Sequence, residues 1–427
     1  MSTTLSNCMT EMSKQIGDYW SSTATGDGAV GGTTVVDALL MEFMNAWVGL
    51  EAHDRITSGT YDEEERYISS LSNTAGTLTT IAHGGQILTN VTYEVHRVAS
   101  ASDKRICLIR AARNCFPDLY TQIADVSKSI SNWLRNPNFE VWASASYPDY
   151  CRVSAVTAAE NTTAPYVRFG SSSCKLSTAA GYMYTTNTLV PDFQDLAGQT
   201  VTFTSHVWCD TASAVRLAIY DGTTTTYSDY HPGTSDWTES SDPLEVSATI
   251  ADTPTSVEFR WYLAKAAATA YIDDARVIGP RRNKYYIGDL GFHKDTPNIV
   301  QIEPSQYSQA EPWKTLRDWW VDNDKYLHLP ATLEDYRLRL RGTKVLDFLA
   351  SGVSSTDWAA TIDIDQPQVD ILVAQAVIEL CNQFMQPNQE SATTDRWERA
   401  KQIWQLEYKE RVGRHGMDAP EATVSWG

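Results

Sequence analysis

The chain has 427 residues and a net charge of −19, with 34 Lys and Arg against 53 Asp and Glu. This length exceeds what one hydrophobic core normally organises, so we expect two or three domains. The acidic balance argues against mainly electrostatic binding of nucleic acid, which needs Lys and Arg to displace counterions, and leaves only a local basic strip for it. No apolar run is long enough to span a membrane, and the N-terminus lacks a signal-peptide pattern, so we expect cytoplasmic synthesis and no membrane partner.

The first 135 residues predict helices combined with small β elements. Apolar residues recur at helical spacing over residues 5–19 and predict a first helix there. The acidic run from Asp62 to Glu65 is interpreted as a solvated helix start rather than a cation site, because negative side chains suit that end of a helix. A second helical pattern starts near Ser102 and extends to Trp133, interrupted at Pro117. Short strands are predicted over residues 34–36, 76–81 and 91–96.

Residues 136–280 differ in character from both flanks. They are rich in Thr, Ser, Tyr and Val and show almost no helical period. Short β-type runs at close spacing are typical of a sandwich of two sheets. The expected strands cover residues 166–169, 200–208, 215–220, 244–250 and 256–263. The pattern predicts an α+β multidomain protein, in which an all-β domain is inserted between two halves of a host domain, residues 1–135 and 281–427.

The second half of the host begins with β-type segments, over residues 298–302 and 336–341. In the latter, three arginines alternate with Tyr and Leu and therefore share one face of the strand: Arg337, Arg339 and Arg341. This face could contact an acidic neighbouring subunit or passing DNA. A merely solvated strand face is the simpler interpretation.

Two helices are predicted near the C-terminus, over residues 367–385 and 391–412. Three aromatic residues follow one side of the second helix and predict packing between neighbouring elements or subunits: Trp397, Trp404 and Tyr408. Pro420 excludes further helix, so the tail after Arg414 is expected to be extended.

No catalytic constellation is recognised. The chain lacks a Gly-rich phosphate loop, an HExxH or GxSxG motif and a CxxC pair. The seven cysteines therefore predict buried free thiols rather than a metal or redox site. Cys151 and Cys174 could pair within the inserted domain, although a reducing cytoplasm argues against it. We predict a protein that is not an enzyme and requires no cofactor.

The two ends of the inserted domain carry motifs of a known family. It opens with Asn-Pro-Asn-Phe-Glu, residues 136–140, and closes with Tyr-Ile-Asp-Asp, residues 271–274. These motifs resemble the first and last strands of galactose-binding-like jelly rolls, which include xylan- and glucan-binding carbohydrate-binding modules. The resemblance implies a jelly-roll sandwich with a structural calcium ion between its paired end strands. Glu140 and Asp273 or Asp274 occupy the matching carboxylate positions, and such hard oxygen ligands suit calcium.

Glycan binding would require aromatic side chains that stack on sugar rings. The inserted domain offers six candidates: Trp142, Tyr147, Tyr150, Tyr184, Trp208 and Trp237. Core packing or a protein contact is the competing interpretation for each. It applies most strongly to Trp142 and Trp208, which have apolar neighbours.

The flanks resemble a different family. Residues 33–40, 59–66 and 93–96, with the helix around Arg110 to Asn114, are similar to the N-terminal part of neck proteins of tailed bacteriophages. Residues 370–380 and 396–411 are similar to the helix pair of the same head–tail adaptor class. The resemblance implies a homo-oligomeric ring, twelve-fold in the family, at the head–tail junction of the virion. Its partners would be the portal protein and the next neck or tail protein, with DNA at most passing through the lumen.

The combined prediction is a structural virion protein that joins portal to tail and carries a projecting jelly roll, which binds glycans or fibres. Most adaptors lack so large an insertion, which departs from the family pattern. Two alternatives remain open: a carbohydrate-active enzyme with a binding module, and a receptor-binding tail-fibre or baseplate protein. The host shows no recognisable acid pair or barrel repeat, which counts against the carbohydrate-active enzyme. The chain shows no fibre-like repeats, which counts against the tail-fibre or baseplate protein.

Overall fold

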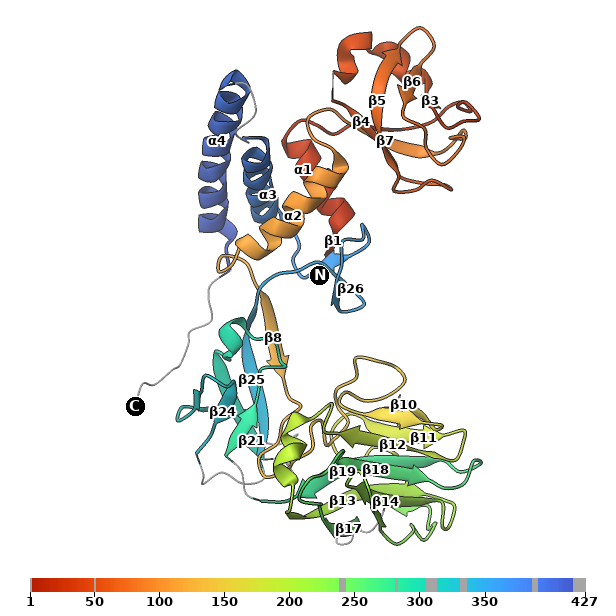
Figure 1. Cartoon of the computed structure of the whole chain (residues 1–427), viewed down its shortest axis with the longest axis vertical. Coiled ribbons are helices and arrows are strands. Elements are labelled where there is room, and N and C mark those ends of the chain that lie inside the picture. The colour runs from red at the N-terminus through yellow and green to blue at the C-terminus, as the bar shows by residue number, and fades with distance from the viewer. Residues whose placement is uncertain are drawn as a thin grey trace. The chain divides into compact units, whose positions relative to one another are not determined.

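The computed structural model describes residues 2–49, 51–237, 243–280, 283–304, 313–330, 336–385 and 391–417. The chain forms two compact units, each described by itself (Figure 1). The first unit comprises residues 1–121 and 345–419, and the second comprises residues 122–344 and 420–427. No helix among the described residues is long and apolar enough to cross a membrane. Most of the predicted extended tail, residues 418–427, lies outside the described residues.

Four helices build the larger core of the first unit: α1 (Leu5–Gln15), α2 (Ala101–Asn114), α3 (Gln368–Phe384) and α4 (Ser391–His415). Helix α3 packs against the other three and is buried along most of its length. A small sheet of β1 (Thr3–Thr4), β28 (Thr361–Ile362), β26 (Leu349–Ala350) and β27 (Val353–Ser354) adjoins them. The helices predicted at 5–19, 367–385 and 391–412 are thus confirmed, with shifted ends.

The second predicted helix is wrong in its C-terminal half. Ser100, not Ser102, is the N-cap of α2, because its hydroxyl accepts a hydrogen bond from the Asp103 amide. The helix ends at Asn114, just before Pro117, whose ring cannot continue helical hydrogen bonding. Beyond it the chain is extended and forms strand β8 (Thr121–Asp125).

The first unit also contains a six-stranded sheet, which exceeds the small β elements predicted for this region. Its order is β2-β7-β4-β5-β6-β3. The strands are β2 (Ser21–Thr23), β3 (Thr34–Val36), β4 (His53–Ile56), β5 (Glu65–Ser72), β6 (Thr77–Thr80) and β7 (Thr92–His96), with the 3-10 helices η1 (Ala38–Glu42) and η2 (Asn45–Val48). The predicted helix start at Asp62 to Glu65 is wrong, since these residues form a turn into β5. The Glu65 carboxylate instead accepts hydrogen bonds from Ala101 and Ser102, at the start of α2.

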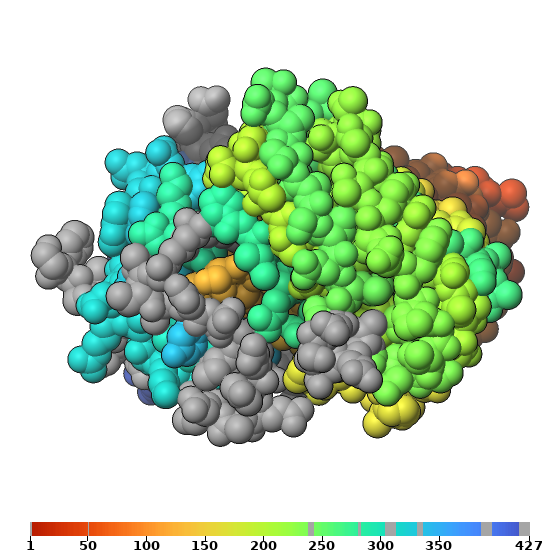
Figure 2. Space-filling model, turned by 90° about the horizontal axis from the view of Figure 1, so that it is seen from below, coloured from red at the N-terminus to blue at the C-terminus, as the bar shows by residue number. Residues whose placement is uncertain are grey.

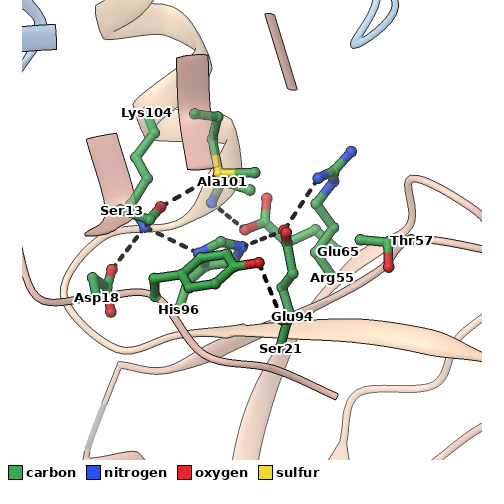
Figure 3. Close-up of polar contacts among 12 residues, drawn as sticks. Ser13, Asp18, Ser21, Arg55, Thr57, Glu65, Glu94, His96, Ala101 and Lys104 are labelled. Carbon is green, nitrogen blue, oxygen red and sulfur yellow. Dashed lines mark hydrogen bonds and ion pairs between the residues drawn. The ribbon is translucent and has the colours of Figure 1, made fainter. Parts of the chain in front are cut away.

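A buried group of charged side chains joins this sheet to the helices within the first unit (Figure 3). The Lys104 ammonium group on α2 donates to Asp18 at 2.8 Å, to Ser13 at 2.9 Å and contacts Nδ1 of His96 at 3.0 Å. Both Lys104 and Asp18 are essentially inaccessible to solvent. Asp18 also accepts hydrogen bonds from the backbone amides of residues 97–99. All N–H groups of the ammonium therefore have acceptors, as a buried charge requires.

The second unit contains a sandwich of two sheets, coloured yellow to green in Figure 1. One sheet has the order β15-β14-β18-β12-β9, and the other has the order β10-β11-β19-β13-β16, with β17 paired to β13. Their strands are β9 (Arg152–Ser154), β10 (Thr157–Asn161), β11 (Ser173–Ser177), β12 (Gly181–Thr186), β13 (Thr200–Cys209), β14 (Val215–Tyr220), β15 (Thr225–Tyr227), β16 (Asp236–Trp237), β17 (Leu244–Thr249), β18 (Glu258–Leu263) and β19 (Ala270–Ile278). Phe203, Phe259 and Trp261 fill the space between the sheets. The predicted sandwich is confirmed, except that residues 166–169 form a loop and not a strand.

The rest of the second unit is a smaller β region. It contains the sheets β22-β21-β25-β8 and β20-β24-β23. The strands are β20 (Lys284–Tyr286), β21 (Ile299–Pro304), β22 (Lys314–Leu316), β23 (Trp320–Val321), β24 (Tyr326–His328) and β25 (Tyr336–Lys344), and the unit also has the 3-10 helices η3 (Pro191–Leu196) and η4 (His293–Asp295). An ion pair of Arg135 with Asp289 and a hydrogen bond from the Trp133 indole to Pro280 connect this region to the sandwich. The compact unit is consequently longer than the predicted insertion, residues 136–280.

Candidate functional site

The outer side of the β15-β14-β18-β12-β9 sheet carries a layer of tyrosines and arginines. Strand pairing brings them together: Tyr182 lies opposite Tyr262, which lies opposite Arg216. In the next row, Tyr184 lies opposite Arg260, which is followed by Ala218 and Tyr227. We call the following set the tyrosine face: Tyr182, Tyr184, Arg216, Tyr220, Tyr227, Arg260 and Tyr262. The alternate residues of the same strands, such as Met183, Leu217 and Trp261, fill the core.

The rings and guanidinium groups of this face hold one another in place. The ring centroids of Tyr182 and Tyr262 are 4.9 Å apart, and those of Tyr227 and Tyr262 are 5.4 Å apart. The Arg260 guanidinium lies 4.1 Å from the centre of the Tyr220 ring and 4.8 Å from that of Tyr182. All seven residues except Tyr227, which is 41% exposed, are half-buried. The face is therefore ordered before any ligand arrives, which reduces the entropic cost of binding.

The two central arginines of the face differ in their partners. Nε and Nη2 of Arg260 both lie 2.8 Å from Oε2 of Glu258, and Nη1 donates to the Tyr262 hydroxyl at 3.0 Å. Arg216 lies 3.6 Å from the centre of the Tyr227 ring and 4.7 Å from that of Tyr230. Among the described residues no carboxylate pairs with Arg216, and its buried Nε has no hydrogen-bond partner. One cation of the face is thus neutralised and the other is not.

The six aromatic residues predicted for glycan contact are not brought together. Only Tyr184 belongs to the tyrosine face. Trp208 and Trp237 are paired on the outer side of the other sheet, where Trp208 packs against Tyr166 and Tyr271. The remaining three are partly buried against the sandwich core: Trp142, Tyr147 and Tyr150.

Most of the tyrosine face was missed from the sequence. The signal was present in the period-2 alternation of Tyr182-Met183-Tyr184 and of Arg260-Trp261-Tyr262. Each stretch places polar aromatic or charged residues on one side of a strand and apolar residues on the other. The sequence does not show which strands are neighbours, so it could not show that these sides form one surface.

The opening motif of the sandwich is an interlocked turn. The Asn136 side chain donates to the carbonyl of Val141 and accepts from its amide, while Phe139 enters the core beside Trp261. Both carboxylates predicted to bind calcium hold the loop of residues 166–172 instead. Glu140 accepts from Ser171 N and Oγ and from Ser172 N, and Asp273 accepts from the amides of residues 168, 169 and 274.

The residues at this clasp do not fit a calcium ion. The oxygens that would bind the cation already face six N–H and O–H donors. Burial raises the pKa of Asp273 to about 7, which weakens it further as an anionic ligand. Asp274 is directed elsewhere, with Arg276 Nε 3.6 Å away and His206 3.8 Å away. No group of three or more His, Cys, Asp or Glu side chains suited to a metal occurs among the residues that the structure describes.

Most of the residues predicted for assembly contacts have partners within the chain. Arg337 pairs with buried Glu303 at 3.2 Å, Arg339 lies over the Trp313 ring, and Arg341 is exposed. On α4, three aromatic residues pack against the helical core: Trp397, Trp404 and Tyr408. The Tyr408 hydroxyl donates to Asp118 at 2.7 Å. These aromatic residues therefore pack between neighbouring elements, which was one of the two predicted uses.

The geometry defines a β-sandwich with an ordered, polar-aromatic outer face. No family model and no curated protein matches the chain. Among solved structures, it is similar to TmCBM61 in complex with β-1,4-galactotriose (15% identity, 35% of this chain and 99% of that one, TM-score 0.25). It is also similar to the CBM22-1 xylan-binding domain from Paenibacillus barcinonensis Xyn10C (12% identity, 38% of this chain and 99% of that one, TM-score 0.27). A third similar structure is the enzymatically active domain of bacteriophage CBA120 tailspike protein 4 (11% identity, 35% of this chain and 22% of that one, TM-score 0.26).

The β-sandwich thus has carbohydrate-binding modules among its structural neighbours. None of the three is a head–tail adaptor, and the resemblance of the flanks to that class stays a prediction.

Proposed function

We propose that the sandwich binds a glycan on its tyrosine face. The observation that carries this proposal is that five tyrosines and two arginines share one side of a single sheet. Tyrosine offers a flat apolar ring for a sugar and a hydroxyl for hydrogen bonds, at little cost in side-chain entropy. Arginine adds up to five N–H donors in a fixed plane, which suits a ligand rich in hydroxyl groups.

A protein partner is the competing occupant, since Tyr and Arg are also enriched in protein interfaces. Such interfaces normally have an apolar centre. The outward positions of β12, β14 and β18 hold Tyr, Arg, Glu and Thr, and the one aliphatic residue among them is Ala218, which is fully buried. Figure 2 shows residues of the sandwich from below, in yellow to green. The lack of exposed aliphatic side chains on the tyrosine face supports the glycan.

Replacing both Tyr182 and Tyr262 by alanine is expected to weaken glycan binding at least about tenfold, because truncation of central aromatic contacts typically costs more than 1 kcal/mol. The full chain and its variants would be tested on a glycan array, followed by titration of the best ligand. Trp237→Ala, on the other sheet, is the control and should bind normally. Loss of binding with Trp237→Ala alone would place the site on the other sheet.

A second candidate is the assembly role predicted from the flanks. It is favoured by helix α4, where Ile403 is 61% exposed and Leu406 is 68% exposed, three residues apart on the same helix. We propose that this side contacts a neighbouring subunit in a virion ring, beside the portal and the next neck protein.

Mass photometry of the purified chain tests the ring. A large oligomer is expected, and it should dissociate in the double variant Ile403→Ser with Leu406→Ser. The control Gln405→Ser alters an exposed residue between them and should leave the oligomer intact. A wild-type chain that remains monomeric at high concentration would contradict the ring without affecting glycan binding.

A further inference from the structure

The unpaired guanidinium of Arg216 indicates what kind of glycan the tyrosine face takes. It is half-buried in strand β14, and no described residue supplies a counter-charge. A partly buried cation without an acceptor costs free energy, which a ligand can recover by supplying one. Arg152, a third arginine on this sheet's outer side, is exposed to water and needs no such partner.

Arg260 is an arginine of the same sheet that is neutralised within the protein. It lies opposite Ala218 on the neighbouring strand, two residues from Arg216, and stacks on tyrosines in the same way. Yet Glu258 neutralises it through two contacts of 2.8 Å. The position opposite Arg216 holds Tyr262, which carries no charge near neutral pH. Cross-strand pairing thus gives one arginine an anion and leaves the other open.

We infer that the tyrosine face takes a glycan bearing carboxylate groups, such as a polymer of uronic acids, and that Arg216 pairs with one of these carboxylates. This inference rests on the proposed glycan binding. The rings of Tyr227 and Tyr230 already supply the stacking contacts of the guanidinium. The N–H groups of its two terminal nitrogens remain for the ligand, and their planar arrangement matches a carboxylate in a two-point contact.

The net charge of the whole chain opposes nonspecific binding of acidic glycans. With a net charge of −19, the protein repels anionic polymers in general. Binding of an acidic glycan therefore requires a local cation, and nonspecific adhesion would not produce it. Added salt should screen both the general repulsion and the local contact of Arg216 with a carboxylate, whereas binding of a neutral glycan should be unaffected.

Biolayer interferometry with the full chain tests the inference. The probes are polygalacturonate, alginate and hyaluronan, each compared with its carboxyl-reduced, neutral form. At least one acidic polymer should bind about tenfold more tightly than its reduced form, as expected for one charge-assisted contact. Arg216→Gln should abolish this ratio, because the acidic polymer would then bind no more tightly than its reduced form. Lys175→Gln removes the same charge from the other sheet and should keep the ratio.

The possible failures are distinguishable. Equal binding of acidic and neutral forms, or a preference that survives in Arg216→Gln, overturns the inference while glycan binding stands. No binding to these polymers or to any glycan of a neutral and acidic array overturns both. A melting temperature of Arg216→Gln equal to that of the wild type ensures that a lost ratio reflects the site and not unfolding.

Discussion

Replacing Lys104 by methionine is expected to lower the free energy of unfolding of the first unit by about 3–5 kcal/mol, the usual cost of leaving one buried charge without its partner. Methionine fills a similar volume, so the loss comes from charge and not from a cavity. Asp18 keeps its three backbone donors but loses the ammonium at 2.8 Å. Ser13 and His96 lose their donor as well. Because total stability is typically about 5–15 kcal/mol, this variant should unfold well below the wild type's temperature.

Hydrogen exchange measured by mass spectrometry is the appropriate readout, because the two units can unfold separately. Peptides from α1, α2 and β7 should lose protection, while peptides from the sandwich serve as an internal reference. Lys14→Met is the matched control, since this lysine lies on α1, is about half exposed and makes only surface contacts, an ion pair with Glu11 and a contact with the Tyr19 ring, among the described residues; it should change stability by less than about 0.5 kcal/mol. Adding Asp18→Asn to Lys104→Met should restore part of the loss. Equal stability of the Lys104 and Lys14 variants would contradict the role assigned to the pair.

Local patterns predicted the elements of this fold well where one spacing persisted over most of the element. Helix α3 was predicted over residues 367–385 and spans Gln368–Phe384, and the alternation of residues 336–341 begins strand β25, which continues to Lys344. The pattern after Pro117 failed because Ile123 and Val126 continue a helical spacing by chance, while β8 pairs with β25 more than 200 residues away along the chain. Such distant pairing is not encoded in any local window.

The candidate site shows the same limit. The outward positions of β12 and of β18 are readable as alternation in the sequence, but their pairing joins residues about 80 positions apart. The Asn-Pro-Asn-Phe-Glu motif was more informative, since its own residues form the turn and direct Glu140 toward the loop. The motif could not show that the loop of residues 166–172 would donate hydrogen bonds to these carboxylates. The amides of residues 168–172 occupy the carboxylates that the resemblance had assigned to calcium.

Replacing Gly170 by alanine should destabilise the sandwich by about 2–3 kcal/mol. Gly170 has φ +77°, a conformation that costs an L-residue about 1–2 kcal/mol. A Cβ atom there would also lie 1.9 Å from Oε1 of Glu140, so the carboxylate would have to move away from Ser171 and Ser172. Loss of these partly exposed hydrogen bonds adds about 1 kcal/mol. Thermal melting and hydrogen exchange over residues 166–173 would measure the effect.

The steric and conformational contributions can be separated because the chain offers a matched glycine. Gly291 has φ +73° with nothing within 4 Å of its would-be Cβ, so Gly291→Ala reports the backbone cost alone. When Gly170→Ala is introduced into Glu140→Ala, it should likewise lower the free energy of unfolding only by the backbone cost, because the clash and the hydrogen bonds are already absent. Added calcium should rescue none of these variants if the carboxylates serve the loop amides. Strict additivity of the two changes would show that Gly170 and Glu140 act independently, and a calcium-dependent rise in melting temperature would restore the metal to this clasp.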